Sequence, residues 1–290
     1  MPRIGAAEYV ARAKINLYLH VVGKRADGFH LLDSLIAFAE TGDRLTVEPA
    51  DELSLLIDGP FASGLQHEKD NLVLRAARGL AALAGRVPAV TIRLTKNLPI
   101  ASGIGGGSAD AAATLRALAA LWQLDPVSDE VRRLALSLGA DVPVCLDGRP
   151  SFIGGIGEEI AAAGTLPPAW LLLVNPRVPT PTPQVFKARR GDFSAPARWQ
   201  LPPGDAGDLA RFLAERRNDL TEPAIIVAPV IRDVLAVLDD TPDCLLSRLS
   251  GSGATCFGVY GSAAAAETAA RYVAQRQAGW WQAVAALATD

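Results

Sequence analysis

A glycine cluster at residues 103–107 is the first segment whose composition could serve chemistry. Four of these five residues are glycine, and Ser108 and a helix-forming sequence follow directly. Glycine loses more backbone entropy on folding than alanine, so such a cluster indicates positive φ angles or a close approach to the main chain. Ser108 is a suitable N-cap for a helix over 108–122. A glycine loop leading into a helix N-terminus offers free N–H groups and a favourable dipole to phosphate, although a tight turn or linker is the alternative.

The spacing of these glycines excludes the commonest phosphate loops. No G-x-x-x-x-G-K-[ST] pattern is present, and Ser108 stands where a G-x-G-x-x-G loop would have its third glycine. The catalytic-loop signature of protein kinases, H-R-D, is also absent. A different kind of phosphate loop is therefore expected.

Lys14 and Asp141 are two further candidates for chemistry. Lys14 lies in the alternating segment 9–22, which is typical of a strand, so its ammonium group must reach solvent or find a partner. Asp141 follows a predicted helix over 129–138 that Gly139 would end. Taken alone, Asp141 could be an ordinary solvated loop residue.

The elements around these residues predict a mixed α+β protein. Further strands are expected at 31–39, 44–48, 53–57, 89–95, 170–174 and near Trp281, and further helices at 71–84, 205–217, 228–238 and 263–275. A proline-rich passage at 176–183 should run extended, and a second glycine loop follows at 250–253. We predict two domains, 1–155 and 156–290.

Composition bounds the class of protein. The net charge of -3 and the scattered charges argue against nucleic-acid binding. Cys145, Cys244 and Cys256 show no C-x-x-C pair, and the three histidines lack metal-ligand spacing, so reduced thiols and no protein-bound metal are expected. The sequence contains no run of about 18 apolar residues, so no membrane span is predicted. The chain is expected to be soluble and cytoplasmic, as a monomer or weak homodimer.

Three motifs carry a resemblance to a known family. The segment 99–112, P-I-A-S-G-I-G-G-G-S-A-D-A-A, resembles the second motif of the GHMP kinases. The segment 249–257, L-S-G-S-G-A-T-C-F, resembles their third motif, and A-K-I-N-L-Y-L at 13–19 resembles their first. The resemblance implies an N-terminal domain like domain 2 of ribosomal protein S5 and a ferredoxin-like C-terminal domain. It also implies ATP-dependent phosphorylation of a small-molecule hydroxyl.

One branch of the GHMP kinases, whose substrate carries a cytidine, fits best. R-A-D-G-F-H at 25–30, D-N-L at 70–72, L-G-A-D-V-P at 138–143, P-T-P-T-P at 179–183 and R-N-D-L-T-E at 217–222 are similar to its motifs. Phe29 replaces a commoner Tyr, Ile104 a Leu, and Ala109 a second Ser. The loss of a hydroxyl at Ala109 leaves Ser108 as the candidate for a phosphate or Mg²⁺ contact.

The resemblance implies a role for each candidate residue. Asp141 would orient the substrate hydroxyl and take its proton, and Lys14 would stabilise the developing charge. ATP, with Mg²⁺, would be bound by Lys96, Pro99, Gly103, Gly105, Gly106, Gly107, Ser108, Asn71 and Asp110. For Asp110, a Mg²⁺ contact and a purely structural cap in the first helical turn are both open. The substrate would contact Asn16, Asp27, Phe29, His30, Phe186, Thr182, Gly251 and Gly253.

Within the substrate site, Phe29 would stack on the base and His30 would bond its edge. Phe186 would close the other side of the ring. Two alternatives remain. One is another GHMP kinase, acting on homoserine, mevalonate or a sugar. None of these substrates carries a base that Phe29 and His30 could bind. The other is a non-catalytic nucleotide-binding module, which would not need both Lys14 and Asp141.

Overall fold

The computed structural model describes residues 7–65 and 71–290, which form two compact units. The first unit consists of the described part of Met1–Ala13 together with Gly42–Ile100 and Gly105–Gly148. The second consists of Lys14–Thr41, Ala101–Ile104 and Arg149–Asp290. The strands β1 (Glu8–Lys24) and β2 (His30–Pro49) each contribute residues to both units. The predicted division at residue 155 stays a prediction.

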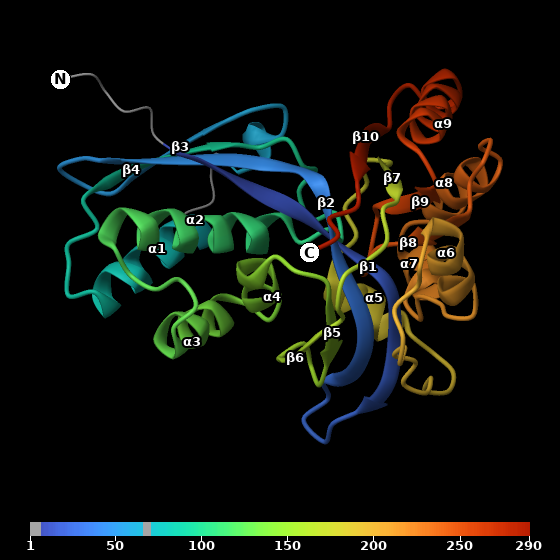
Figure 1. Ribbon diagram of the computed structural model, residues 1–290, viewed down its shortest axis with the longest axis horizontal. Coiled ribbons are helices and arrows are strands. Elements are labelled where there is room, and N and C mark those ends of the chain that lie inside the picture. The colour runs from blue at the N-terminus through green and yellow to red at the C-terminus, as the bar shows by residue number, and fades with distance from the viewer. Residues whose placement is uncertain (1–6, 66–70) are drawn as a thin grey trace. The chain divides into compact units, whose positions relative to one another are not determined.

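In the first unit, helices cover part of a sheet in which β4 lies between β3 and β2 (Figure 1). Strand β4 (Val90–Thr95) pairs in antiparallel fashion with the end of β2 and in parallel with β3 (Ser54–Asp58). The other elements are a 3₁₀ turn (Ala62–Gly64), α1 (Leu72–Leu83), α2 (Gly106–Trp122), α3 (Asp129–Leu138) and α4 (Val142–Asp147). Helix α1 packs on α2 and α3. Its N-terminus is capped by Asn71, which accepts a hydrogen bond from the Val73 N–H (2.9 Å).

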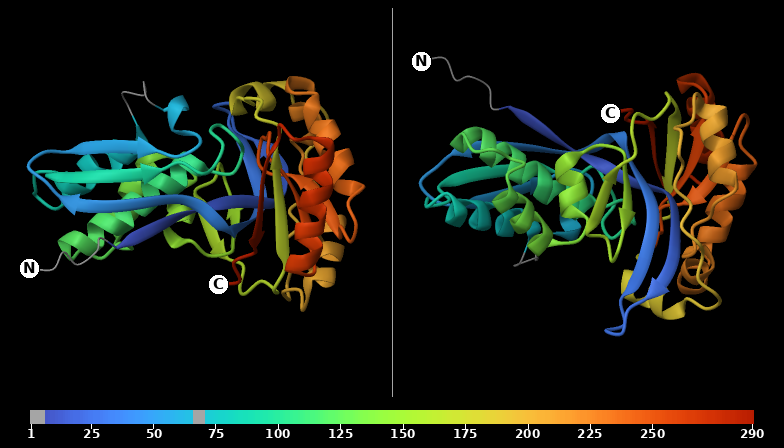
Figure 2. Two further views of the ribbon diagram at one scale, coloured as in Figure 1. Left: turned by 90° about the horizontal axis from the view of Figure 1, so that it is seen from above. Right: turned by 60° about the horizontal axis from the view of Figure 1, so that its bottom comes forward.

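In the second unit, β2 pairs with β5 (Ser151–Gly154), which pairs with β6 (Glu159–Ala162). A separate antiparallel sheet has the order β10-β7-β9-β8, and α8 and α9 pack on its strands (Figure 2). Its strands are β7 (Trp170–Asn175), β8 (Leu246–Leu249), β9 (Cys256–Tyr260) and β10 (Trp281–Ala286). The helices are α5 (Thr182–Ala188), α6 (Ala206–Ala214), α7 (Thr221–Val227), α8 (Val230–Asp239) and α9 (Ala263–Arg276). The buried core between them includes Val174, Ile231 and Val273.

Several sequence predictions of elements need correction. The strands expected at 31–39 and 44–48 are one continuous strand, β2. In the segment between them, a Cβ at Gly42 would lie only 2.1 Å from the Ala11 carbonyl oxygen. Glycine at this position therefore lets β2 continue past β1.

Three short helices were not predicted: α4, α5 and α7. Each has a proline in its first turn, Pro143, Pro183 and Pro223, where the missing N–H costs no hydrogen bond. The proline-rich passage therefore ends in a helix, since α5 begins at Thr182.

Candidate active site

The segment 101–104 and the second glycine loop, 250–253, pack backbone against backbone in the second unit. A Cβ at Gly103 would lie 2.6 Å from the Ser250 carbonyl oxygen and 2.7 Å from that of Gly253. The Thr255 N–H donates to the Ser102 carbonyl (3.0 Å). Gly103 also has a φ of 76°. A side chain is therefore excluded at Gly103 both by space and by backbone conformation.

Ser250 joins these loops to β1. Its hydroxyl accepts a hydrogen bond from the Asn16 N–H (3.2 Å) and donates to the Gly103 carbonyl (3.1 Å). The Lys14 N–H donates to the Ile104 carbonyl (3.0 Å). Sequence reasoning missed Ser250, although a serine in a glycine loop beside a glycine was a signal that could have been used.

Lys14 and Asn16 lie side by side on β1, as residues two apart on a strand do. The Lys14 ammonium group donates to the Asn16 side-chain oxygen (3.0 Å), and the Asn16 amide donates to the Ser34 hydroxyl (2.8 Å). Both side chains are buried. Asn16 is thus one partner of Lys14, as a lysine on an apolar strand requires. The Gly251 backbone lies beside Asn16, so the second glycine loop is close to Asn16 as well.

Asp141 belongs to the first unit and is the N-cap residue of α4. It is half-buried, and its side chain makes no capping hydrogen bond with the helix. Asp141 therefore lies at the start of a helix, and not in an open loop as in the alternative interpretation. Because Lys14 belongs to the second unit, the predicted pairing of Lys14 with Asp141 stays a prediction.

Helix α2 begins two residues before the predicted start. Gly105 is its N-cap, with a left-handed φ of 66°, and Gly106 and Gly107 form its first turn. Ser108 is therefore not the N-cap, and Asp110 falls beyond the first turn. The Ala109 N–H donates to the Gly105 carbonyl (2.8 Å), which shows that the glycines already follow the helical path. Their lack of side chains leaves the backbone N–H groups of this turn accessible to a ligand.

A buried ion cluster of Asp43, Lys96 and Asp110 lies behind this turn in the first unit. The Lys96 ammonium group pairs with Asp43 and with Asp110, the latter at 2.7 Å. The other Asp43 oxygen accepts hydrogen bonds from the Asn97 (2.6 Å) and Leu98 (2.9 Å) N–H groups. The cluster thus fixes the end of β4 and the start of the glycine loop, where the buried Pro99 follows, to α2.

Two carboxylates share one ammonium group in this cluster, and this affects the protonation of Asp110. Burial, followed by the nearby Asp43, raises the pKa of Asp110 to about 7 against the opposing effect of Lys96. The two carboxylates raise the pKa of Lys96 in spite of its burial. One Asp110 oxygen, Oδ1, is buried without a hydrogen-bond partner. These contacts favour a structural role for Asp110 as the partner of Lys96, although not as the predicted cap in the first helical turn. Asn71 uses its side chain to cap α1.

A cavity of about 720 Å³ in the second unit contains the predicted base-binding residues. The His30 and Phe186 rings stack there, with centroids 5.1 Å apart and planes inclined by 25°. Phe29 lines the same cavity and is 58% exposed. Asp27 accepts hydrogen bonds from the Phe29 N–H (3.3 Å) and from Arg25 (2.7 Å), so it shapes the turn before β2.

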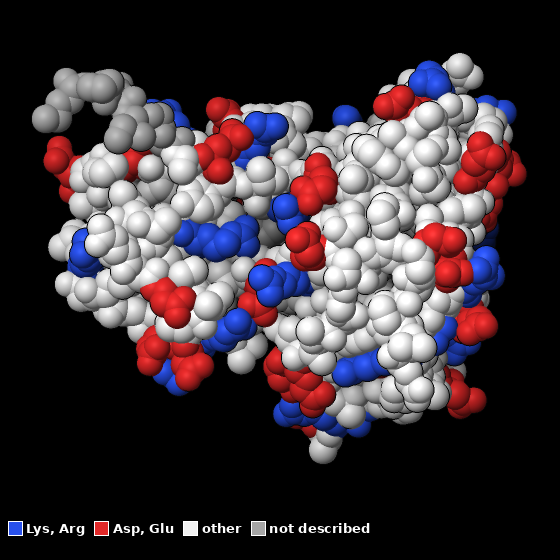
Figure 3. All heavy atoms as spheres, viewed as in Figure 1, with Lys and Arg blue, Asp and Glu red and all other residues white. Residues whose placement is uncertain are grey.

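The charged side chains that line this cavity, among the described residues, are all basic: Lys24, Lys187, Arg189 and Arg190. Burial, Lys24 and Arg189 lower the pKa of His30, so its imidazole is neutral at physiological pH and has one donor and one acceptor nitrogen. Figure 3 shows Lys and Arg side chains interspersed with Asp and Glu on the face drawn there. An anionic ligand with a flat ring fits the basic side chains and the aromatic rings of the cavity.

Thr182 connects the cavity with the second glycine loop. Its hydroxyl lies 2.8 Å from that of Ser252, which stands between Gly251 and Gly253. Gly251 has a φ of 55° and Gly253 one of 90°. The structure therefore brings together, within the second unit, the predicted substrate residues Asn16, His30, Phe186, Thr182, Gly251 and Gly253.

Comparisons with known proteins define the class. The family model "GHMP kinases N terminal domain" matches residues 71–149, and "GHMP kinases C terminal" matches 197–278. A homoserine kinase structure from Cytophaga hutchinsonii has the same fold, with a TM-score of 0.74 at 16% identity over 100% of this chain and 96% of that one. The chain has the two-domain α+β fold of a GHMP kinase, as predicted.

More similar relatives define the family within this class. A protein of Paramagnetospirillum magneticum described as 4-diphosphocytidyl-2-C-methyl-D-erythritol kinase is 57% identical over 277 residues, which are 96% of this chain and 97% of that protein. A crystal structure of 4-(cytidine 5'-diphospho)-2C-methyl-D-erythritol kinase has a TM-score of 0.81 at 33% identity, covering 98% of this chain and 100% of that one. The chain belongs to the 4-diphosphocytidyl-2-C-methyl-D-erythritol kinase family.

None of the helices within 7–65 and 71–290 is long and apolar enough to cross a membrane.

Proposed function

We propose that this protein transfers the γ-phosphoryl group of ATP to the 2-hydroxyl of 4-diphosphocytidyl-2-C-methyl-D-erythritol, a step of non-mevalonate isoprenoid precursor synthesis. One observation carries the choice of substrate. The cavity combines the stacked His30 and Phe186 rings with a rim of lysines and arginines. A cytosine ring suits the first feature, and a diphosphate suits the second.

In the proposed reaction, Asp141 orients the substrate hydroxyl and accepts its proton. The substrate oxygen then forms a bond to the γ-phosphorus of ATP, and the bond from that phosphorus to the β–γ bridging oxygen breaks, which releases ADP. Lys14, held by Asn16, stabilises the negative charge on the transferring group. The role of Asp141 and Lys14 as a catalytic pair is part of this proposal.

The two glycine loops divide the work of binding phosphate. We propose that the N–H groups of Gly105, Gly106 and Gly107 at the start of α2 bind the ATP phosphates. Gly103, Gly251 and Gly253 would border the transferred group, beside Lys14. Lys96, Pro99 and Asn71 would support the glycine loop structurally. The burial of Lys96 and the capping hydrogen bond of Asn71 favour this role.

Mg²⁺ is proposed to enter with ATP. It would neutralise part of the charge on the phosphates. Asp110 does not fit a magnesium ligand well, since its carboxylate is buried against the Lys96 ammonium group. Ser108, in the first turn of α2, is half-buried and fits better as a residue that a phosphate or its hydrated cation could contact.

Release of ADP by the purified protein tests the proposal. ATP and Mg²⁺ would be supplied with 4-diphosphocytidyl-2-C-methyl-D-erythritol, homoserine or mevalonate in parallel. Turnover with the cytidylyl substrate alone is expected, because neither of the others has a base for the His30–Phe186 stack. Turnover with homoserine or mevalonate would overturn the assigned substrate, and ATP binding without any turnover would favour the non-catalytic module.

A further inference from the structure

The motif R-N-D-L-T-E at 217–222 has no role in the reaction described above, yet it lies against β1 in the second unit. The Leu19 N–H donates to the Arg217 carbonyl (3.1 Å), and the Asp219 N–H donates to the Leu19 carbonyl (2.8 Å). The intervening residue, Asn218, forms an isolated parallel bridge with Leu19. Asn218 is thereby fixed beside the strand that carries Lys14 and Asn16.

The Asn218 side chain is directed at the second glycine loop. Its amide nitrogen donates to the Leu249 carbonyl and to the Gly251 carbonyl, both at 2.8 Å. Its oxygen accepts a hydrogen bond from the Leu220 N–H (2.9 Å). The side chain is 4% exposed, so water does not readily replace these bonds. Both amide protons of Asn218 are therefore used to hold one loop.

The two carbonyls flank Ser250, whose hydroxyl bonds to β1 and to Gly103. Asn218 holds the loop from one side, and Ser250 connects the same loop to the Lys14–Asn16 strand and the first glycine loop. At Gly251, one of the residues fixed in this way, a Cβ would lie 2.9 Å from the Gly103 carbonyl oxygen and 3.4 Å from the Asn16 side-chain oxygen. A change in the loop conformation would thus alter the surroundings of the Lys14 partner.

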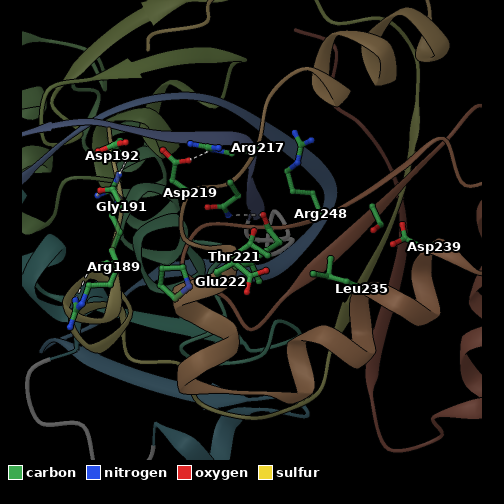
Figure 4. Close-up of a pocket in the computed structure, with 15 residues that line it drawn as sticks. Arg189, Gly191, Asp192, Arg217, Asp219, Thr221, Glu222, Leu235, Asp239 and Arg248 are labelled. Atoms are coloured by element: carbon green, nitrogen blue, oxygen red, sulfur yellow. Dashed lines mark hydrogen bonds and ion pairs between the residues drawn. The ribbon is translucent and has the colours of Figure 1, made fainter. Parts of the chain in front are cut away.

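The rest of the motif has other contacts. The Asp219 carboxylate accepts hydrogen bonds from the Val21 N–H (2.7 Å) and the Ser194 hydroxyl (2.8 Å), and from Arg217 (2.5 Å). Figure 4 shows Arg217 and Asp219 turned toward each other at the edge of a cavity of about 560 Å³. The contacts of Asp219 fix the motif to β1 and to Ser194, whereas those of Asn218 reach the second glycine loop.

From these contacts we propose that Asn218 is a positioning residue for phosphoryl transfer, which sets the conformation of the second glycine loop, 250–253, through side-chain hydrogen bonds to Gly251 and to Leu249, the last residue of β8. This inference rests on the proposed role of Gly251 and Gly253 beside the transferred group. Asn218 does not touch the reacting atoms. It acts through the loop, and only an amide has two N–H donors and an acceptor in this arrangement.

Asn218→Asp is the most direct test because it keeps the volume and removes both donors. Its carboxylate oxygen would face two carbonyl oxygens, which repel it. We expect kcat to fall about 10- to 100-fold, while KM for the cytidylyl substrate stays within about 3-fold, since an interaction needed mainly in the transition state is lost. Asn218→Ala lets water reach the carbonyls, so its kcat should lie between those of wild type and Asn218→Asp. It replaces Asn218→Asp as the test if the aspartate variant does not fold.

Asp219→Asn is the matched control, because it alters the adjacent residue and leaves the loop contacts of Asn218 in place. Its kcat, measured per folded molecule below the melting transition, should stay within about 3-fold of wild type. An equal loss of kcat in the Asp219 and Asn218 variants would show that Asn218 has only a structural role in the motif, and it would overturn the proposal.

Hydrogen exchange supplies a readout that does not depend on turnover. In the Asn218 variants, amides of residues 249–255 should exchange faster than in wild type, and those of α9 should be unchanged. Unchanged exchange in the loop, or an unchanged kcat, would overturn the inference. If wild type itself fails to turn over the cytidylyl substrate, the proposed function fails, and the exchange data still decide whether Asn218 holds the loop.

Discussion

At the scale of single residues, Lys14 and Asp141 are the side chains on which the proposed chemistry depends. We predict that Lys14→Ala and Asp141→Asn each lower kcat by about 10²-fold or more, because a positioned base and a stabilising cation act on the transition state. Steady-state ADP release with the cytidylyl substrate measures this.

Asp147→Asn is a suitable control for Asp141→Asn. Asp147 is the last residue of α4, the helix that Asp141 begins, and it pairs with Arg132 at 2.8 Å. Its variant should retain kcat within about 2-fold, as expected for a partly exposed ion pair. Near-normal turnover in both Lys14→Ala and Asp141→Asn would remove these residues from the mechanism.

Phe186 is the second residue-scale test, because its ring stacks on His30 in the basic cavity. Phe186→Ala should raise KM for the cytidylyl substrate about 3- to 10-fold, the value of a lost aromatic contact. KM for ATP should be unchanged, since the proposed ATP loop lies on α2. An effect on ATP that equals the effect on the cytidylyl substrate would contradict a separate base pocket.

Residue identity also shows how far the sequence can predict a site. Lys14 was a candidate because a lysine on an apolar strand needs a partner, and the structure supplies one in Asn16. Ser250 and Asn218 lie in segments that the sequence singled out, 249–257 and 217–222, but their contacts were not predicted, because these contacts join residues 234 and 33 positions apart along the chain. A hydrogen bond to a distant carbonyl leaves no local pattern of composition or period.

At the scale of elements, the long helices and the strands with clear alternation were predictable from their periodicity, and their ends were not. The short strands β5, β6, β8 and β9 were not predicted, because four or five residues are too few to show a period. Ser108 was a better N-cap by residue type, yet the left-handed Gly105 begins α2. The start of that helix is fixed from behind by Asp43, Lys96 and Asp110, which come from β2, the end of β4 and α2. Tertiary contact thus overrode local preference.

This ion cluster leads to a prediction about pH and stability. The pKa of Asp110 is about 7 in the folded protein, against an ordinary value of 3.8, so the native state binds more protons than the unfolded state between these values. Stability should therefore fall as pH rises through this range. Lys96, whose pKa is raised, stays charged throughout.

Asp110→Asn should remove that pH dependence. Between pH 5.5 and 8, wild type should lose about 1–2 kcal/mol of unfolding free energy more than the variant does. Urea unfolding at both pH values measures the difference, and comparison of the two proteins cancels the contributions of titrating groups that lie away from this cluster. Parallel pH profiles would show that Asp110 does not titrate in this range.

At the scale of the whole molecule, β1 and β2 contribute residues to both compact units. Unfolding of either unit would break strands on which the other depends. We therefore predict one cooperative thermal transition, with a calorimetric enthalpy equal to the van't Hoff enthalpy.

Cytidine diphosphate provides the test of this coupling, because the cavity proposed for it is lined by residues of the second unit alone. At 100 times its dissociation constant, the ligand should stabilise the folded protein by about 2.7 kcal/mol. If the units unfold together, scanning calorimetry should show the single transition move upward by about 4–5 °C, because the unfolding entropy of a chain of 290 residues is about 0.6 kcal/mol per kelvin. Homoserine should cause no shift. Two transitions, of which only one moves with cytidine diphosphate, would show that the shared strands do not couple the units, whereas a single transition that ignores the ligand would argue against the cytidine pocket itself.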